Sequence, residues 1–412
     1  MNGSNFQIEQ QCPQCGAPII LDEADRILSC KFCRTHVYLA TEDLFRFYIP
    51  PAQGISETIY FIPYWRIKGL SYTIGGMDIS NKYFDINFLC LDSKLLPHSL
   101  GLRPQAMKLK FVGGNNDDTG KFIASSSNTR EALLNNFRTH TSEPRQQEIF
   151  IGETVSVIYT PVYFANGCLC DAVLKSPFYP KIEEAAIRPA LDSAPDEKWH
   201  VEFLPLLCPD CGADLPGGKD ALTVFCGNCN SAWNPSTKNF TKVKYSAWQE
   251  QGDDITYLPF WQMKVKVSGF QLETYADLIK LANLPKAPSE EWTKTPFYFC
   301  APAFKLNPVL FLRWCRQLTA TPSPKDLTDD FPAKKIHQVT LPVNEALGSS
   351  ILTLSSLIAD KRHLADVAAS LKFSLEDYSL VFHPFKISAG ELVHTKLDFA
   401  MDSSALTLGS YL

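Results

Sequence analysis

The chain has 412 residues, of which 45% are hydrophobic and 20% are charged, the composition of a folded globular protein. Its formal net charge is −5 and no block of five like charges occurs, which excludes the long-range positive field that attracts nucleic acid. The N-terminus has no basic stretch followed by an apolar run, and no segment is apolar over the roughly 18 residues that a spanning helix needs. We therefore expect two to four domains, no membrane span and a cytoplasmic location.

Two cysteine clusters of the same design dominate the motif content. CPQCG opens the first cluster at residues 12–16 and CPDCG opens the second at residues 208–212. Each cluster reads C-x2-C-x14-C-x2-C, so that two short turns present four thiolates, which is the ligand set that tetrahedral zinc prefers. Without an export signal, metal-bound thiolates are favoured over disulfides. The predicted ligands are Cys12, Cys15, Cys30, Cys33, Cys208, Cys211, Cys226 and Cys229.

These residues resemble the zinc-ribbon family of small four-cysteine modules, in which CPxCG forms the first knuckle. The resemblance covers roughly residues 7–40 and 203–235. It implies two Zn²⁺ per chain in closed, structural sites that leave no position for a substrate. A rubredoxin-like iron site or a redox dithiol is the alternative, although the second pairs here are CKFC and CGNC instead of a second CPxCG.

Between the first cysteine cluster and the linker, the sequence predicts mostly strands. Aromatic and β-branched residues predict strands at 57–74, 82–92, 107–111, 154–165 and 168–174. Residues 128–140 have the spacing of an amphipathic helix. Prolines and charges at 176–200 indicate a linker that contains a short helix, which we expect to end at Arg188 because a proline follows it.

The second half repeats the first. Adding 196 to each position of the first cluster gives the second cluster, and the same offset takes IPYW at 62–65 to LPFW at 258–261. A later match joins 157–169 to 380–392 with an offset of 223. We therefore predict a tandem duplication whose second copy has gained about 27 residues, part of them at 270–295. Additional helices of the second half are expected at 307–318, 343–360 and 362–371.

The predicted fold class is α+β with mostly antiparallel β-sheet. Each half is a zinc ribbon followed by a β-rich domain, and the second domain carries helical insertions. The predicted organisation is zinc ribbon 1 at 1–42, β-rich domain 1 at 43–180, the linker at 181–200, zinc ribbon 2 at 201–238 and β-rich domain 2 at 239–412.

Two sets of residues are candidates for binding. The tip of the first ribbon combines Arg26, Lys31, Phe32 and Arg34, a basic and aromatic group of a kind that can stack a base, or that forms a solvated or protein-facing surface. Prolines in the segments 61–69, 158–167, 257–265 and 381–390 are expected at sheet edges or bulges. The aromatic residues beside two of them form either core, the favoured interpretation, or a groove: Tyr64, Trp65, Phe260 and Trp261.

Enzyme motifs are missing from the sequence. It has no phosphate-binding P-loop, no G-x-S-x-G and no H-E-x-x-H, and His383 aligns with Thr160 where a duplicated catalytic site would repeat the histidine. We expect a non-enzymatic zinc-binding scaffold or adaptor that engages a protein partner or assembly through its duplicated units. A nucleic-acid-binding factor that uses the ribbon tips is the alternative. An enzyme with its site in the second-half insertion is a third interpretation.

Overall fold

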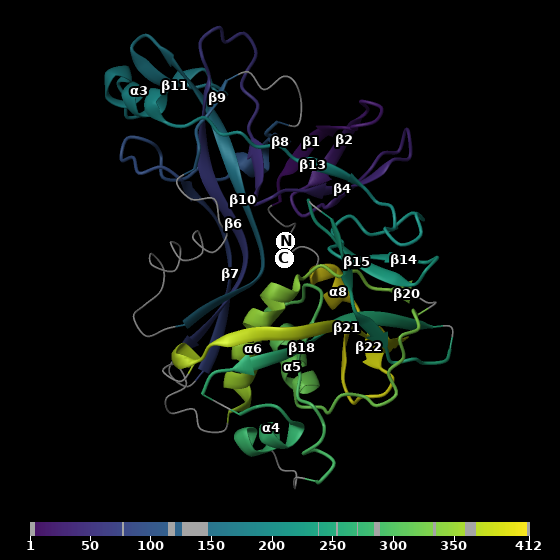
Figure 1. Cartoon of the computed structure of the whole chain (residues 1–412). Helices are drawn as coiled ribbons and strands as arrows, with labels where there is room; N and C mark the ends of the chain where they lie inside the picture. The colour runs from purple at the N-terminus through teal and green to yellow at the C-terminus, as the bar shows by residue number, and fades with distance from the viewer. Residues whose placement is uncertain are drawn as a thin grey trace.

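The computed structural model describes residues 5–75, 78–113, 120–125, 147–237, 239–252, 254–269, 271–283, 289–332, 335–358 and 368–409. Strands account for 42% of it and helices for 16%, and most strand pairs are antiparallel. In Figure 1 the sheet of the first half lies above that of the second half, and the cysteine-containing segments lie to one side. Among the described helices, none is both long and apolar enough to cross a bilayer.

The first half is built on a ten-stranded sheet. Its path runs β12-β11-β10-β5-β8-β1-β2, and β6 joins β10 to β7 and β9. The bounds are β1 (Gln7–Gln11), β2 (Pro18–Asp22), β5 (Phe45–Tyr48), β6 (Tyr60–Gly75), β7 (Asp78–Leu89), β8 (Lys108–Phe111), β9 (Lys121–Phe122), β10 (Gln147–Ala165), β11 (Cys168–Asp171) and β12 (Ser176–Pro177), with the short helix α1 (Arg103–Ala106). The strands predicted in this half are confirmed, and the helix predicted at 128–140 lies outside the described residues.

The second half is built on a seven-stranded sheet with helices packed against it. Its path runs β19-β18-β21-β22-β23, with β17 on β21 and β20 on β18. The bounds are β17 (Tyr245–Ala247), β18 (Ile255–Val267), β19 (Phe299–Pro302), β20 (Lys335–Ile336), β21 (Phe373–Ser388), β22 (Glu391–His394), β23 (Ala400–Asp402), α4 (Tyr275–Ala282), α5 (Pro308–Thr319), α6 (Val343–Leu357) and α8 (Ser404–Gly409). Helices α5 and α6 confirm two predicted helices, and the one predicted at 362–371 falls mostly outside the described residues.

Two small sheets lie beside the cysteine clusters, and one of them links the halves. One is formed by β3 (Ile27–Ser29), β4 (His36–Ala40) and β13 (Glu202–Pro205), and the other by β14 (Val224–Cys226), β15 (Ser231–Pro235) and β16 (Phe240–Val243). Strand β13 enters the second half of the sequence, yet it pairs with β4 of the first half, with Phe203 opposite Leu39. The two cysteine-containing segments are therefore joined by backbone hydrogen bonds.

The central strand pair of each half has the same register. On β6 and β10, Pro63 lies opposite Tyr159 and Phe61 lies opposite Pro161. On β18 and β21, the positions 196 and 223 residues later pair in the same way: Pro259 lies opposite Phe382 and Tyr257 lies opposite Pro384. The outer neighbours also correspond, because β7, β9, β5 and β11 have counterparts in β19, β20, β17 and β22.

Four prolines lie in these central strands, each at the point where the neighbouring strand changes. Pro63 lies between the part of β6 that pairs with β9 and the part that pairs with β7, and Pro161 lies between the β5 and β11 segments of β10. Pro259 and Pro384 repeat this arrangement. A proline has no N–H to leave unpaired where the neighbouring strand changes, and each proline carbonyl accepts one backbone N–H at 3.0–3.1 Å. The expectation of edges or bulges is therefore wrong.

The helix expected to end at Arg188 is longer than predicted. Helix α3 (Glu184–Ser193) continues through Pro189. An interior proline removes one helical hydrogen bond, but Ile187 and Leu191 on either side of it are buried in the core of the first half, and this packing outweighs the local preference of the sequence.

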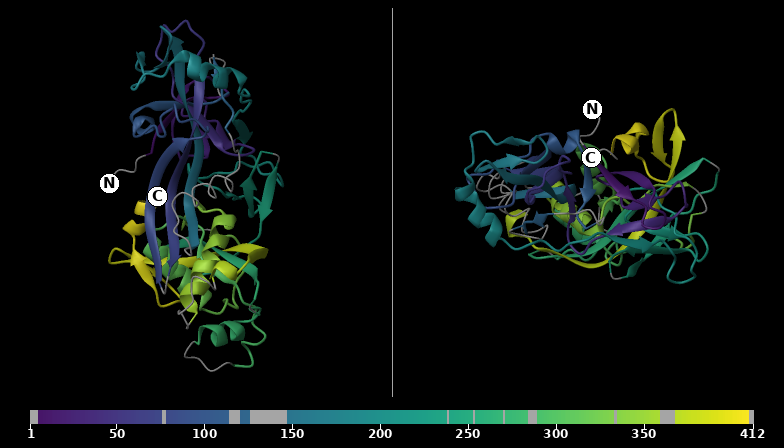
Figure 2. Two further views of the ribbon diagram at one scale, coloured as in Figure 1. Left: turned by 90° about the vertical axis from the view of Figure 1, so that its left-hand side faces the viewer. Right: turned by 90° about the horizontal axis from the view of Figure 1, so that it is seen from above.

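The first half also packs against the helices of the second half. Figure 2 shows the long strands β6, β7 and β10 running alongside these helices. Leu70, Tyr72 and Ile151 belong to the same hydrophobic cluster as α5 and α6. The Tyr72 hydroxyl donates to the carbonyl of Pro308 at 2.9 Å, across the boundary between the halves.

Candidate metal centres and an aromatic pocket

The first cysteine cluster, Cys12, Cys15, Cys30 and Cys33, brings four sulfur atoms within 4.8 Å of one another. The Sγ atoms of Cys12 and Cys33 are 3.6 Å apart, as are those of Cys15 and Cys30. Gly16 has a φ of 74°, which allows its N–H to turn back to the Cys12 carbonyl at 2.9 Å. The CPxCG turn therefore aims two thiols at the other pair.

The second cysteine cluster, Cys208, Cys211, Cys226 and Cys229, has the same construction. Its Sγ atoms also lie within 4.8 Å, with 3.5 Å between Cys208 and Cys229 and 3.4 Å between Cys211 and Cys226. Gly212 has a φ of 73° and donates to the Cys208 carbonyl at 2.8 Å. Within the described residues, these two groups of four thiols are the ones that could hold a metal ion.

Ionisation of the thiols is uneven within a cluster. The hydroxyl and backbone N–H of Thr35 lower the pKa of Cys33 to about 6. The backbone N–H of Ala17 favours the Cys15 thiolate, but the neighbouring thiols, Cys33 first, together with desolvation outweigh it and raise the pKa of Cys15 to about 12. Four thiolates so close together are stable only beside a cation, so the donor set fits a tetrahedral metal ion.

The residues predicted at the tip of the first ribbon separate into two groups. Lys31, Phe32 and Arg34 are exposed around the second knuckle, and the Phe32 side chain is 75% exposed. Arg26 lies elsewhere, half-buried over the ring of Phe45 at 4.6 Å. The structure thus brings three of the four candidates together.

The four predicted aromatic residues are all buried. Tyr64 and Trp65 lie in two separate clusters of the first half, whereas Phe260 and Trp261 belong to the large cluster of the second half. Each is at most 3% exposed, in agreement with a core position. Phe260 and Trp261 have a further feature, because they also line a pocket.

This aromatic pocket has a cavity volume of about 20 Å³, roughly one water molecule, and lies between β18, β19, β21 and the segments around α4 and α5. Its other walls carry threonine, serine, proline, leucine, valine, glutamine, cysteine and one histidine, His383. The aromatic residues in its walls are Trp248, Phe260, Trp261, Tyr275, Phe297 and Tyr298. Sequence reasoning did not find it, since its walls come from segments far apart in the chain.

His383 is paired with a second buried histidine. Nδ1 of His383 lies 3.0 Å from Nε2 of His394 on the neighbouring strand β22. Nδ1 of His394 accepts the backbone N–H groups of Lys396 and Leu397, both at 3.0 Å. Burial lowers the pKa of His383 well below its usual value and that of His394 to about 3, so both rings are neutral at ordinary pH.

The corresponding positions of the first half carry different chemistry. Thr160 and Asp171 stand 223 residues before His383 and His394. Asp171 accepts the backbone N–H groups two and three residues later at 2.8 and 3.0 Å, as His394 does. Arg103 reaches both side chains, with 2.5 Å to the Asp171 carboxylate and 3.4 Å to the Thr160 hydroxyl. The turn that follows Asp171 or His394 is therefore the same in the two halves, whereas the side chains at these positions differ in chemistry.

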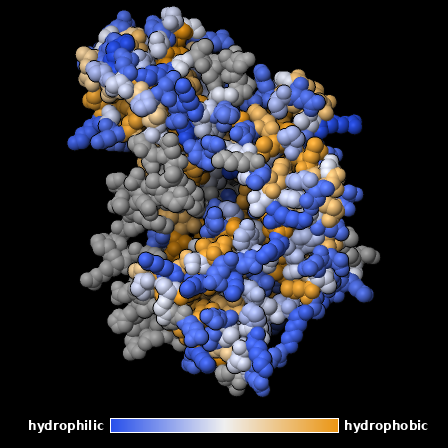
Figure 3. Space-filling model, viewed as in Figure 1, coloured by the Kyte–Doolittle hydropathy of each residue, from blue (hydrophilic) through white to orange (hydrophobic). Residues whose placement is uncertain are grey.

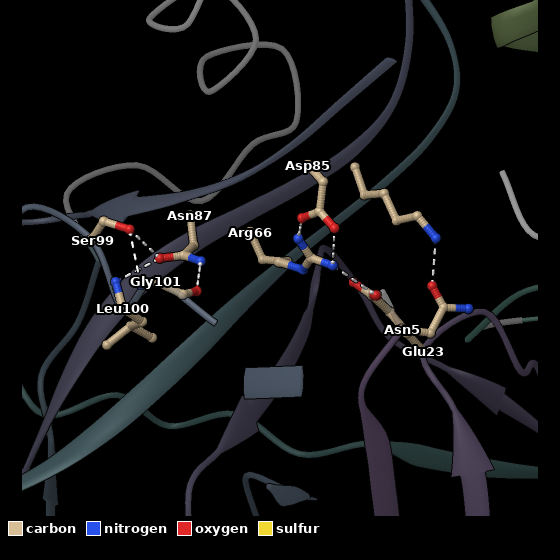
Figure 4. Close-up of polar contacts among 9 residues, drawn as sticks. Asn5, Glu23, Arg66, Asp85, Asn87, Ser99, Leu100 and Gly101 are labelled. Atoms are coloured by element: carbon tan, nitrogen blue, oxygen red, sulfur yellow. Dashed lines mark hydrogen bonds and ion pairs between the residues drawn. The ribbon is translucent and has the colours of Figure 1, made fainter. Parts of the chain in front are cut away.

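A buried charge network ties the first cysteine segment to the first sheet. Arg66 on β6 is fully buried and contacts the carboxylate of Asp85, which β7 provides, and that of Glu23 at 3.4 Å (Figure 4). Burying a guanidinium is unfavourable unless such partners surround it. Because Glu23 lies in the loop between the cysteine pairs, the network fixes this loop against the sheet.

A second hollow opens between the second cysteine segment and the second sheet. It has a volume of about 490 Å³ and is lined by Asp220, Lys305, Lys335 and His337 among others. Figure 3 shows hydrophilic and hydrophobic residues interspersed on the face in view and a hollow near its middle. Burial lowers the pKa of both Lys305 and His337. Since charges of both signs line this hollow, it does not select a ligand of one charge.

Known proteins offer no direct guide to these sites. No protein-family model matches the chain, and comparison with curated proteins and with solved structures gives no match.

Proposed function

We propose that the protein is a non-enzymatic, zinc-binding scaffold or adaptor whose two ribbon-plus-β units engage a protein partner or assembly. The proposal rests on one observation: the two cysteine-containing segments pack together as one unit. The backbone N–H groups of Arg26 and Ile27 both donate to the Lys219 carbonyl, at 2.6 and 2.8 Å. Ile27 also shares a hydrophobic cluster with Cys208 and Cys226. Such a body presents two metal modules in a fixed relation.

A tandem duplication explains this arrangement. It is supported by the equal construction of the two CPxCG turns, by the matched register of β6–β10 and β18–β21, and by the four prolines at equivalent changes of neighbour. The halves diverged where the second gained α4, α5 and α6, and of these α5 and α6 pack against β6 and β10 of the first half.

Zinc is the metal that we propose for both clusters. Four thiolates at tetrahedral spacing saturate the shell of Zn²⁺ and leave no open position for catalysis. Metal analysis of the purified protein is expected to find about two zinc ions per chain. Cys15→Ser and Cys211→Ser should each lose one, whereas Cys168→Ser, outside both clusters, should lose none. Iron in place of zinc, or a zinc content unchanged in both cluster variants, would overturn the assignment.

The scaffold proposal is tested by partner capture. Tagged protein isolated from its native cells should carry a defined partner, identified by mass spectrometry, that binds the purified protein again in size-exclusion chromatography. Phe32→Asp at the exposed tip should weaken this complex, whereas Val309→Asp, at another exposed site on α5, should not. A turnover that vanishes on changing one pocket residue while both zinc ions remain bound would contradict a non-enzymatic role.

We also propose a reducing, cytoplasmic environment. The thirteen cysteines are all free thiols in the structure, which agrees with their use as metal ligands and core residues. Alkylation of intact cells followed by mass spectrometry should find these cysteines reduced, and disulfide-linked cysteines in the native protein would contradict this location.

Nucleic-acid binding is a second candidate, and one observation favours it: Phe32 is exposed between the basic residues Lys31 and Arg34. An aromatic side chain flanked by cations can stack a base and contact phosphates. Single-stranded oligonucleotides should then bind with a strong dependence on salt, and the double variant Lys31→Ala, Arg34→Ala should reduce both the affinity and the salt dependence. No binding to DNA or RNA at low salt would exclude this candidate.

A further inference from the structure

A small polar cavity lies between the two halves of the protein, and both cysteine-containing segments contribute to its lining. Its volume is about 110 Å³, which is room for several water molecules. The first half provides Ala24, Arg26 and Thr154, and the second half provides Asp220, Leu222, Lys305, Thr340, Pro342 and Glu345. Charged side chains from both halves therefore line one space.

Arg26 lines this cavity without an ion-pair partner among the residues that the structure describes. Its Nη1 donates to the backbone carbonyls of Glu23 and Asp25 at 3.3 and 3.1 Å. The carboxylates of these two residues contact other cations, at 3.4 Å from Arg66 and 3.5 Å from Lys219. Burial lowers the pKa of Arg26, although nearby acidic groups favour its charge. A carboxylate that enters the cavity would therefore gain a charge-assisted hydrogen bond.

Asp220 lines the same cavity and belongs to the loop between the cysteine pairs of the second cluster. Within the described part of the chain, its carboxylate has neither a hydrogen-bond partner nor an ion-pair partner. Its charge favours the protonated form of Arg26, yet the two side chains do not form an ion pair. Arg26 and Asp220 are thus near enough to act on each other's charge and too far apart to pair.

The remaining charges of the cavity come from Lys305 and Glu345. Glu345 accepts the backbone N–H of Gly152 at 2.7 Å, and its charge favours the protonated form of Lys305. The described lining therefore carries two cations and two anions. A ligand with a single charge would leave this space with a net charge, which is unfavourable away from water, whereas a zwitterion keeps it neutral.

The cavity continues into the hollow beside Lys335 and His337, because Asp220, Lys305 and Thr340 line both spaces. This hollow has a volume of about 490 Å³, within the range of small-molecule sites. Its apolar walls are formed by Ile336, Ile387, Leu392 and Leu406. The Ile387 side chain is 53% exposed, so an apolar group placed in the hollow would remove it from water.

We propose that the cavity and the hollow form one binding site for a free α-amino acid with an apolar side chain. The carboxylate of the ligand accepts from Arg26, its ammonium group donates to Asp220, and its side chain packs against the apolar walls of the hollow. Because Arg26 and Asp220 belong to different cysteine-containing segments, the ligand bridges the two segments. The site goes beyond the scaffold role and does not depend on it.

Matched probes test the chemistry of the ligand by isothermal titration calorimetry on the full-length, metal-loaded protein. L-Leucine carries all three groups, 4-methylpentanoate lacks the ammonium group, and 3-methylbutylamine lacks the carboxylate. We expect leucine to bind at least about tenfold more tightly than either, because each missing contact is a hydrogen bond between charged groups. Glycine, which lacks the apolar side chain, should also bind more weakly than leucine.

Variants test the location. Asp220→Asn keeps the shape of the side chain and removes its charge, so it should weaken leucine binding about tenfold or more without weakening the binding of 4-methylpentanoate. Arg26→Gln should weaken leucine binding without weakening that of 3-methylbutylamine. The controls are Asp214→Asn and Arg34→Gln, which lie outside the lining and should bind leucine as the wild type does. The Asp220 and Asp214 variants keep the test decisive if Arg26→Gln does not fold.

Each part of the proposal can fail separately. A lack of leucine binding up to its solubility limit would exclude the site. Equal binding of leucine and 4-methylpentanoate, or of leucine and 3-methylbutylamine, would exclude recognition of a zwitterion. Equal leucine binding by the Asp220→Asn and Asp214→Asn variants would exclude this location. None of these measurements involves a protein partner, so their outcome is separate from that of the scaffold proposal.

Discussion

His394 donates its Nε2 proton to Nδ1 of His383 over 3.0 Å, and this contact holds both imidazoles in one protonation state. The rings are at most 6% exposed and are packed among Trp248, Phe260 and Phe385. A further proton on His394 would enter on Nδ1 and displace two backbone N–H donors. The pair therefore resists protonation for reasons of both burial and geometry.

The stability of the protein should fall below neutral pH because of this pair. Both histidines have folded-state pKa values below the unfolded value of about 6.5. Above that pH both states are neutral; below it the unfolded chain binds protons that the folded chain does not. The free energy of unfolding should therefore decrease by up to about 1.4 kcal/mol per pH unit for each histidine. Urea unfolding between pH 7 and pH 5.5 measures this slope.

A variant of His394 distinguishes the contribution of the histidine pair to this slope from that of other titratable groups. His394→Asn can still accept the two backbone N–H groups but does not titrate, so its slope should be shallower than that of the wild type. His98→Asn, at an exposed site, should leave the slope unchanged. The charged residues near the pair are Lys396, its salt-bridge partner Asp326, and Glu250, which bonds Thr395. Equal slopes in all three proteins would show that the pair is not responsible.

Removing Arg66 should destabilise the first half strongly. Arg66→Ala leaves the carboxylates of Glu23 and Asp85 near the interior without their cation, and breaking such a buried pair typically lowers the free energy of unfolding by about 3–5 kcal/mol. Lys108→Ala is the control, because its pair with Glu9 at 3.2 Å is exposed and should contribute less than about 1 kcal/mol. Similar losses for the two variants, measured by urea unfolding, would contradict the structural role of the network.

Local patterns predicted the cysteine clusters and the long strands. The ligand spacing is set within one turn at each knuckle, and aromatic and β-branched residues favour extended chain, so both features can be recognised from short windows. Helix α4 was missed although it has local signals: Thr274 and Asp277 form a capping box, and Asn283 ends the helix in the left-handed conformation.

Features that depend on tertiary register could not be predicted in this way. His383 and His394 meet only because the hairpin of β21 and β22 places Phe385 opposite His394. The role of the four prolines depends on which strands lie beside them, information that the sequence of one strand does not contain. Pro189 stays in a helix because Ile187 and Leu191 are buried on each side of it.

The turn between β21 and β22 offers a stabilising change. Ala389 has a φ of 51° and is followed by Gly390, while the first half has Asn166 and Gly167 at these positions. Asparagine tolerates the left-handed region better than alanine and is preferred with glycine in such two-residue turns. Ala389→Asn should therefore raise the free energy of unfolding by up to about 1 kcal/mol, and Asn166→Ala should lower it by a similar amount. Changes of the opposite sign in urea unfolding would contradict this interpretation of the turn.

Loss of metal from the second cluster should be visible at one tryptophan. Trp233 donates to the Ser231 hydroxyl at 2.7 Å, and this hydroxyl lies 3.0 Å from the sulfur of Cys229. If zinc orders this cluster, Cys211→Ser should release Trp233 from its buried site and shift tryptophan emission to longer wavelength, because the indole becomes exposed to water. Cys15→Ser, in the cluster without a tryptophan, should shift it less. The shift should disappear when Cys211→Ser is combined with Trp233→Phe, and a shift that persists would mean that the perturbation arises elsewhere in the shared core.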